Sequence, residues 1–259
     1  MDFVDVKTLI DQASTWNPKP LIQLSLIGEP TLYPHLVESV QYASSKGLET
    51  RIYTNGQLLT RQLMKDLLSA GLTTFSATID GVTKETYETI RPGLTFETVR
   101  QNFLDAWELC KNSNTRMNVG AVITEETKHE SNQVKAFWTS RSHKFFFNPE
   151  VGGIDPHGNK PGRVGPVFPR GIYKGIYTNC LSWTPWTQMA VRVNGDIPMC
   201  TKMYRWGCDP CMGNAFTSEI PLLEIYNSDE WDDYRRKVEN LVELPYQCKL
   251  LCHGFGDER

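Results

Sequence analysis

The strongest constraint on the fold is a regular alternation of strand-like and helix-like segments in the first half of the chain. Short apolar, β-branched runs occur at Leu21–Ile27, Thr50–Tyr53, Thr74–Ile79, Met117–Ile123 and Lys144–Phe147. Between these runs, apolar residues recur at three- and four-residue spacing, as at Val99, Phe103, Ala106 and Cys110. That spacing is typical of amphipathic helices. The alternation therefore predicts an α/β fold with parallel strands and crossover helices.

Capping residues agree with this assignment. Thr60 and Thr95 stand where helix N-caps are expected, and Gly47 and Gly71 stand where helices should end. Cys110 falls on the apolar face of its helix, and we expect it to be a small core residue rather than a metal ligand.

The pattern changes near residue 150. Residues 152–175 are rich in glycine and proline, which is typical of a loop or a domain junction. We therefore expect an α/β domain at 1–150, a junction at 151–179 and a small irregular cysteine-rich domain at 180–259. Within the last part, Val191–Pro198 predicts a hairpin that turns at Asn194-Gly195, and Leu222–Val242 predicts one or two helices.

Composition excludes several classes of partner. The chain has 259 residues, a net charge of −3 and a pI near 6.0, which argues against nucleic acid as the main partner. It has no apolar run of membrane-spanning length and no secretory signal at its N-terminus, so we expect a cytoplasmic protein without a membrane partner. Seven cysteines, an odd number, favour metal binding over a disulfide framework.

Polar and glycine-containing motifs follow three successive strands. They are Gly28-Glu29-Pro30, Thr54-Asn55-Gly56 and Thr78-Ile79-Asp80-Gly81, and the last is followed by Arg91. The carboxyl ends of parallel strands are where α/β barrels build their sites. Each motif alone could also be an ordinary turn, because Asn-Gly and Asp-Gly are common turn dipeptides. For Asp80 the turn interpretation is about as good as a binding role.

The C-terminal cysteines give the stronger metal signal. Cys180, Cys200, Cys248 and Cys252 supply four thiolates from two distant segments, which suits either a [4Fe–4S] cluster or a zinc site. Cys208 and Cys211 form a further Cys-x2-Cys pair. Three interpretations of this pair are open: a secondary ligand pair, an extra loop feature or a redox pair. As a ligand pair, it could combine with Cys248 and Cys252 in a zinc site.

Together these motifs resemble the radical S-adenosylmethionine (radical SAM) enzymes that carry a C-terminal SPASM-type iron–sulfur domain. Cys180-x2-Trp183-x-Pro185-Trp186 and Asn194-Gly195-Asp196-x2-Met199-Cys200 are similar to a shortened SPASM domain. The resemblance implies a partial (β/α)6 TIM-like barrel, with strands 2–6 but not the first strand, followed by the SPASM-like domain. It also implies S-adenosylmethionine as a cofactor and one auxiliary [4Fe–4S] cluster held by the C-terminal cysteines.

The resemblance assigns roles to the strand-end residues. The segment Gly28-Glu29-Pro30 matches the Gly-Gly-Glu-Pro motif that holds the methionine amino group, with Ile27 in place of the first glycine. Thr78 and Arg91 would lie near the cofactor's carboxylate. The residues that would line the cofactor or the substrate are Thr54, Asn55 and Asp80.

One family motif is absent from this sequence. The catalytic cluster of the family is held by a Cys-x3-Cys-x2-Cys loop before the Gly-Glu-Pro strand, and here no cysteine precedes Cys110. We expect the chain to start just after that loop, as a truncated form, as one part of a split protein or as a degenerate relative. A catalytic [4Fe–4S] cluster would then need ligands from a missing N-terminal loop.

The resemblance implies an oxidoreductase when the protein is full length. Such an enzyme generates a 5′-deoxyadenosyl radical that abstracts hydrogen from a peptide or small-molecule substrate, with a ferredoxin or flavodoxin as electron donor. The alternative is a non-catalytic iron–sulfur or zinc-binding scaffold derived from the same fold. The sequence assigns no catalytic acid or base.

Overall fold

The computed structural model describes residues 1–25, 28–149, 184–201, 211–240 and 242–243. The chain divides into two compact units, one formed by Val6–Glu150 and the other by Met1–Asp5 together with Val151–Arg259. Helix α1 (Phe3–Ser14) begins in the second unit and continues into the first.

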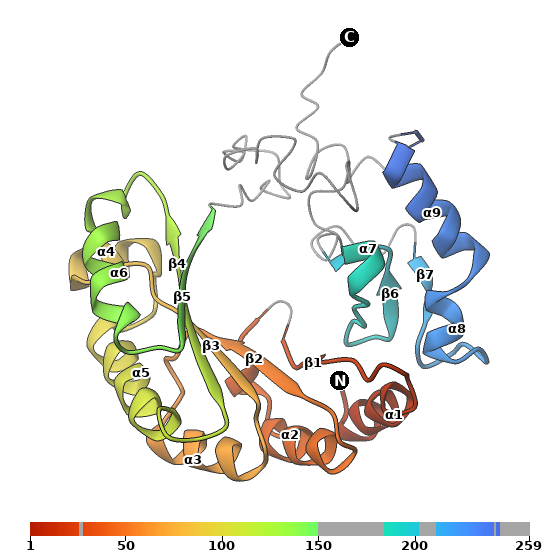
Figure 1. Ribbon diagram of the computed structural model, residues 1–259, viewed down its shortest axis with the longest axis horizontal. Coiled ribbons are helices and arrows are strands. Elements are labelled where there is room, and N and C mark those ends of the chain that lie inside the picture. Colours follow the sequence, from red (N-terminus) through yellow and green to blue (C-terminus); the bar gives the residue numbers. More distant parts are fainter. Residues whose placement is uncertain (26–27, 150–183, 202–210, 241, 244–259) are drawn as a thin grey trace. The chain divides into compact units, whose positions relative to one another are not determined.

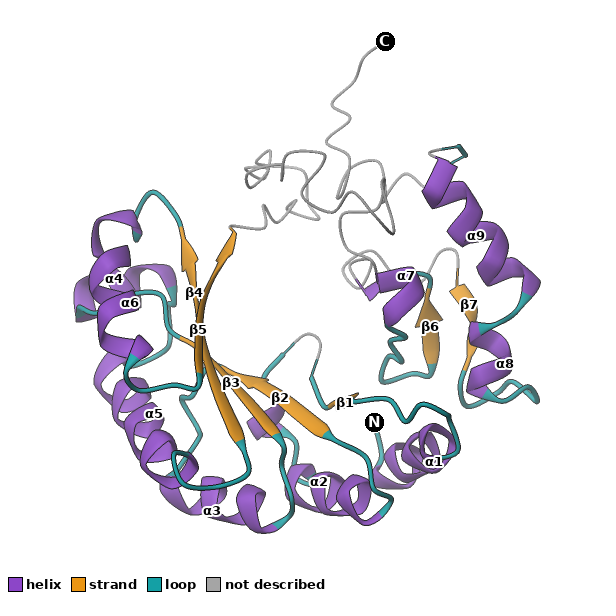
Figure 2. Cartoon of the chain, viewed as in Figure 1, coloured by secondary structure: helices purple, strands orange, loops and turns teal. Residues whose placement is uncertain are grey.

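The unit Val6–Glu150 is built on a five-stranded parallel sheet with the order β1-β2-β3-β4-β5 (Figures 1 and 2). Its strands are β1 (Ile22–Gln23), β2 (Thr50–Thr54), β3 (Thr74–Thr78), β4 (Arg116–Ile123) and β5 (Lys144–Pro149). Each strand pairs with its neighbour in sequence, as in a β/α barrel and unlike a doubly wound sheet, where the order reverses. The predicted α/β fold with a partial TIM-like barrel is confirmed.

Strand β1 is shorter than the predicted run Leu21–Ile27. Its ladder with β2 covers only Ile22 and Gln23. Beyond them, the hydroxyl of Ser25 accepts the hydrogen bond of the Tyr53 amide at 3.1 Å. A side chain thus takes the place of a backbone acceptor, so the regular ladder ends.

The helices of this unit lie along one face of the sheet (Figure 2). They are α2 (Leu36–Ser45), α3 (Arg61–Ser69), α4 (Lys84–Ile90), α5 (Phe96–Cys110) and α6 (Ser131–Thr139), with short 3₁₀ turns at Pro30–Leu32 and Lys128–Glu130. Thr60 caps α3 by accepting from the Leu63 amide at 3.1 Å, whereas Thr95 is an N-cap without a side-chain bond. Gly47 and Gly71 follow helices in the left-handed conformation, with φ of +69° and +93°.

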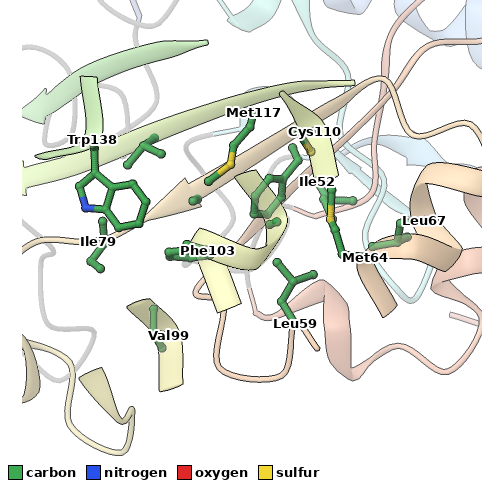
Figure 3. Close-up of a cluster of buried hydrophobic side chains, with 14 of the residues drawn as sticks. Ile52, Leu59, Met64, Leu67, Ile79, Val99, Phe103, Cys110, Met117 and Trp138 are labelled. Carbon is green, nitrogen blue, oxygen red and sulfur yellow. The ribbon is translucent and has the colours of Figure 1, made fainter. Parts of the chain in front are cut away.

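The core between sheet and helices includes several aromatic side chains, of which Figure 3 labels Phe103 and Trp138. The ring of Phe103 on α5 lies 6.0 Å from that of Phe75 on β3 and 6.2 Å from that of Trp138 on α6. Cys110 is fully buried in the same cluster, and burial raises the pKa of its thiol to about 12. It is therefore a neutral core residue, as the sequence predicted.

The second unit contains α7 (Thr184–Thr187), β6 (Asp196–Pro198), β7 (Cys211–Asn214), α8 (Leu222–Tyr226) and α9 (Asp229–Asn240). The Asn194-Gly195 turn is present, with φ of +89° at Gly195, and the predicted helical region forms two helices. The predicted hairpin contact across the turn is present, since the Arg192 amide donates to the Asp196 carbonyl at 2.9 Å, but the strand ladder of β6 forms with β7. Asn214 of β7 explains this, since its amide donates to the Asn194 carbonyl at 2.9 Å and to Asp196 at 3.1 Å.

Within the described ranges, no helix is long and apolar enough to cross a membrane.

Candidate cofactor site and iron–sulfur region

Glu29 joins the loops that follow β1 and β2. Its Oε1 accepts hydrogen bonds from the Thr31 amide at 3.2 Å, the Thr31 hydroxyl at 2.6 Å and the Thr54 hydroxyl at 2.6 Å. Among the described residues, its Oε2 accepts one hydrogen bond, from the backbone amide of Asn55 at 2.8 Å. Since a carboxylate oxygen has two lone pairs, Oε2 can accept one more donor. The structure therefore brings together three residues that the sequence singled out.

Thr54 and Asn55 use their side chains to shape the loop. The Thr54 hydroxyl, which donates to Glu29, also accepts from the Gly56 amide at 3.0 Å. The Asn55 side chain accepts from the Gln57 amide at 2.9 Å. Thr54 is 3% exposed, and its hydroxyl proton is donated to Glu29. The hydroxyl of Thr54 therefore helps to hold the Glu29 carboxylate in place.

The backbone next to Glu29 is open on one side. Gly28 has φ of +86°, and a Cβ built on it would meet no atom within 4 Å. Pro30 is buried and begins the 3₁₀ turn that orients the loop. A glycine with free space on its Cα face permits the close approach of a ligand to the backbone.

Asp80 and Arg91 form a second group, after β3. Arg91 is the C-cap residue of α4, and its Nε and Nη2 each lie 2.7 Å from Oδ2 of Asp80. The other oxygen of Asp80 accepts from the Val122 amide of β4 at 2.6 Å. No residue in the described part of the chain accepts a hydrogen bond from Nη1 of Arg91, so this nitrogen can donate to a ligand.

The two groups stand at the carboxyl ends of adjacent strands. Thr54, the last residue of β2, lies opposite Ala77 of β3, and Thr78 ends β3 opposite Gly120 of β4. Thr78 is half-buried and has the position that the sequence predicted for it. The predicted site residues therefore share one edge of the sheet.

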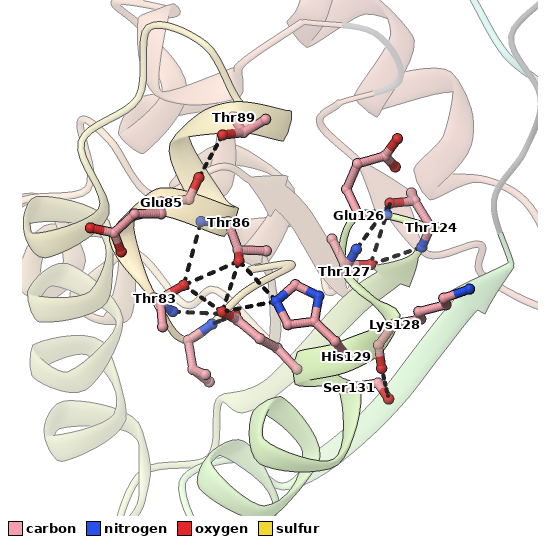
Figure 4. Close-up of polar contacts among 12 residues, drawn as sticks. Thr83, Glu85, Thr86, Thr89, Thr124, Glu126, Thr127, Lys128, His129 and Ser131 are labelled. Carbon is pink, nitrogen blue, oxygen red and sulfur yellow. Dashed lines mark hydrogen bonds and ion pairs between the residues drawn. The ribbon is translucent and has the colours of Figure 1, made fainter.

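Sequence reasoning missed Glu130, which fixes the loop after Asp80. Glu130 is 4% exposed, and its carboxylate accepts from the Val82 amide at 2.7 Å, from the Thr86 hydroxyl at 2.8 Å and from the Thr83 hydroxyl. Figure 4 shows Thr83 and Thr86 beside His129, the residue that precedes Glu130. Burial by itself would raise the pKa of this carboxyl, but the hydrogen bonds outweigh burial and lower it. Because Glu130 is distant in sequence from the loop that it holds, no local spacing signals the contact.

Of the four cysteines predicted as principal ligands, the structure describes Cys200. It follows β6, is 5% exposed and packs with Met199 against Tyr234 and Val238 of α9. Cys180, Cys248 and Cys252 lie outside the described residues, as does Cys208. Cys211, on β7, is disulfide-bonded. Among the described residues no group of three or more potential metal ligands occurs.

Comparison with known proteins decides the family. A model of the radical SAM superfamily matches residues 1–132, about half of the chain. The chain belongs to the radical SAM superfamily. A model of the SPASM iron–sulfur cluster-binding domain matches residues 180–253. Membership of the radical SAM superfamily and the SPASM domain imply [4Fe–4S] clusters and S-adenosylmethionine as cofactors.

Individual relatives of this radical SAM protein match over short segments. The AdoMet-dependent heme synthase of Methanosarcina barkeri is 36% identical over 87 residues, which is 34% of this chain and 24% of that protein. The PqqA peptide cyclase of Bradyrhizobium diazoefficiens is 44% identical over 55 residues, 21% of this chain and 14% of that protein. The matched segments thus cover a quarter or less of the curated relatives.

A solved structure shows the same fold. Streptococcus suis SuiB bound to S-adenosylmethionine superposes with a TM-score of 0.59 at 16% identity, over 90% of this chain and 60% of SuiB.

The described residues of this radical SAM protein fit the implied cofactor. S-adenosylmethionine carries an ammonium group, for which Oε2 of Glu29 has a remaining lone pair, and a carboxylate, for which Nη1 of Arg91 has remaining donors. Gly28, which precedes Glu29, leaves open space in which a ligand can approach the backbone. In the SPASM region, the buried Cys200 is a donor of the type that iron–sulfur clusters use.

Proposed function

We propose that this chain is the cofactor- and substrate-holding part of a radical SAM enzyme that abstracts hydrogen from a peptide or small-molecule substrate. In this proposal Gly28, Glu29 and Pro30 hold the amino end of S-adenosylmethionine, and Arg91 pairs with its carboxylate. Thr78 lies beside the carboxylate. The wall of the site is completed by the side chains of Asn55 and Asp80 and by the loop that the Thr54 hydroxyl holds in place.

A reduced [4Fe–4S] cluster would give one electron to the sulfonium of bound S-adenosylmethionine and so supply methionine and a 5′-deoxyadenosyl radical. The residues of this chain bind and orient. Glu29 is held by three neighbours, so its acceptor atoms are fixed before the ligand arrives. Asp80, 2% exposed, fixes the guanidinium of Arg91 through two nitrogens. Such preorganisation places the reacting part of a ligand with little loss of conformational entropy on binding.

The single observation that carries the proposal is the position of the Glu29 carboxylate. It lies at the carboxyl edge of a parallel β/α sheet, next to a glycine with open space, and it retains one acceptor position. This combination suits the capture of an ammonium group at a barrel mouth.

In the SPASM region we propose that Cys180, Cys200, Cys248 and Cys252 hold the auxiliary [4Fe–4S] cluster, which positions the substrate or carries electrons. Cys208 and Cys211 are secondary candidates.

A peptide substrate is supported by the similarity to a PqqA peptide cyclase, and a small-molecule substrate by the similarity to a heme synthase. A ferredoxin or flavodoxin as electron donor and a cytoplasmic location complete the proposal.

Calorimetric titration of the anaerobically purified chain with S-adenosylmethionine tests the cofactor site. The test variant is Gly28→Ala and the matched control is Gly47→Ala. Both glycines have positive φ, and the new methyl group would meet nothing at position 28 and only the mobile end of Lys19 at position 47. We expect saturable binding that weakens at least tenfold in Gly28→Ala and is unchanged in Gly47→Ala.

Absence of binding to the unmodified chain would favour the non-catalytic scaffold instead. Equal binding by both variants would show that the cofactor does not bind next to Gly28. Zinc, rather than iron and sulfide, in the anaerobically purified protein would contradict the auxiliary cluster.

A further inference from the structure

The strands of the unit Val6–Glu150 have an uneven charge. Their sequences contain three basic residues, Arg51 on β2, Arg116 on β4 and Lys144 on β5, and no acidic residue. None of these three is among the strand-end residues discussed above. We call these three residues the basic face.

All three basic side chains point away from the helices. Successive side chains of a strand alternate between the two faces of a sheet. The residue that follows each basic residue packs in the core on the helix side: Ile52, Met117 and Phe145. The basic face therefore occupies the side of the sheet that the helices leave uncovered (Figure 2).

The strand register places the basic residues near one another. Arg51 lies opposite Thr74 of β3, and Thr74 lies opposite Arg116. Neighbouring strands are separated by about 4.8 Å, so the Cα atoms of the two arginines are about 10 Å apart. Lys144 lies opposite Asn118, one step farther along the same face. Two long side chains that flank a small threonine can reach a single ligand between them.

The basic face has no acidic partner in the described part of the chain. Every ion pair found among those residues involves other cations. Moreover, Nε of Arg51 is buried and has no hydrogen-bond partner among the described residues. A buried donor of this kind is costly to leave unpaired, and a guanidinium is shaped to bind a carboxylate or a phosphate through two nitrogens.

We infer that the basic face binds an anion, a carboxylate or a phosphate, near the amino ends of β2, β4 and β5. Arg51 and Arg116 hold the anion, and Lys144 adds charge from β5. This inference goes beyond the proposed function, whose cofactor site lies at the carboxyl ends of the strands, and it rests on the contacts above.

Calorimetric titration of the full chain at low ionic strength tests the inference with two probes, inorganic phosphate and glutarate. The test variants are Arg51→Gln and Arg116→Gln. The control is Arg61→Gln, which removes the same charge from helix α3, where Arg61 pairs with Asp105 at 3.4 Å. We expect each test variant to bind the preferred probe at least tenfold more weakly and the control to bind it normally.

Preference for phosphate or for glutarate identifies which anion the face accepts. Arg51→Lys should retain part of the affinity, because it keeps the charge and loses the planar fork. Circular dichroism checks that each variant is folded. Because Arg116 is exposed, Arg116→Gln should fold and still tests anion binding if Arg51→Gln folds poorly. Unchanged binding in both test variants, or an equal loss in Arg61→Gln, would overturn the inference.

Titration with S-adenosylmethionine separates this result from the proposed function. If the chain binds the anion through Arg51 and Arg116 but does not bind S-adenosylmethionine, the proposed function fails and the anion site stands. If the cofactor binds and neither anion does, only the anion site fails.

Discussion

Two nitrogens of Arg91, Nε and Nη2, converge on a single oxygen of Asp80 at 2.7 Å each, while the second oxygen of Asp80 accepts the Val122 amide at 2.6 Å. One carboxylate therefore ties the end of α4 to β4 at the edge where the proposed cofactor site lies. The arginine that the sequence assigned to a ligand is held in place before any ligand binds.

The two members of this pair should differ in their importance for stability. Asp80 is 2% exposed and Arg91 is 35% exposed. Arg91→Gln leaves a buried carboxylate without its cation and should destabilise the protein by about 3 kcal/mol. Asp80→Asn leaves a guanidinium that water reaches and should cost clearly less. Urea denaturation measures both, and a larger loss for Asp80→Asn would contradict this account.

Gly56 should tolerate no side chain. Its φ is +80°, and a Cβ there would lie 2.4 Å from the ring of Phe103. Gly56→Ala should cost about 1–2 kcal/mol for the left-handed backbone and about 1–3 kcal/mol for overpacking. Gly93→Ala is the control, because Gly93 has φ of +90° and no atom near its Cβ position. Thermal unfolding should show the greater loss for Gly56→Ala, and equal losses would refute the clash.

Glu130 should make the free energy of unfolding depend on pH in the acid range. Its folded pKa is lowered from the ordinary value of 4.5 because hydrogen bonds from Thr83, Val82 and Thr86 outweigh the effect of burial. A carboxyl with a depressed folded pKa contributes stability above its unfolded pKa, and this contribution is lost as pH falls through the folded value. The wild type should therefore lose stability progressively below about pH 4.5.

Glu130→Gln tests this explanation. The amide can accept through one oxygen only, so it should leave buried donors unsatisfied and cost about 1–3 kcal/mol at neutral pH. The difference in unfolding free energy between wild type and variant should then shrink as pH falls from 6 to 3. A difference that stays constant over this range would show that the charge of Glu130 is unimportant.

Cys200 and Cys110 form a matched pair for the metal site. Both are buried, with exposures of 5% and 0%, so serine substitution disturbs packing at either position. We expect Cys200→Ser to lose most of the iron of the anaerobically purified protein and Cys110→Ser to retain it. Iron and sulfide analysis measures both, and full iron retention in Cys200→Ser would exclude Cys200 as a ligand.

Periodicity and turn residues predicted the five strands of Val6–Glu150 and the helices α2, α3 and α5, because burial of one helix face and φ at Gly47 and Gly71 are set locally. The early end of β1 was not predicted, since it depends on the contact between Ser25 and Tyr53. The pairing of β6 with β7 depends likewise on Asn214, which is distant in sequence from the turn that it binds.

For the candidate site, the sequence identified Glu29, Thr54 and Asp80 but not how they are connected. The motifs show which polar groups follow which strand. They do not show that Glu29 accepts from both Thr54 and Asn55, or that Glu130 holds the loop after Asp80. Those contacts arise from the parallel register, which brings together residues far apart in the chain.

Hydrogen exchange measured by mass spectrometry, with and without S-adenosylmethionine, tests the central claim most directly. The account predicts slower exchange in peptides that contain Gly28–Thr31, Thr54–Gln57 and Arg91, with no change in α9. Unchanged exchange at these three segments, or protection confined to residues 184–240, would contradict the proposed cofactor site.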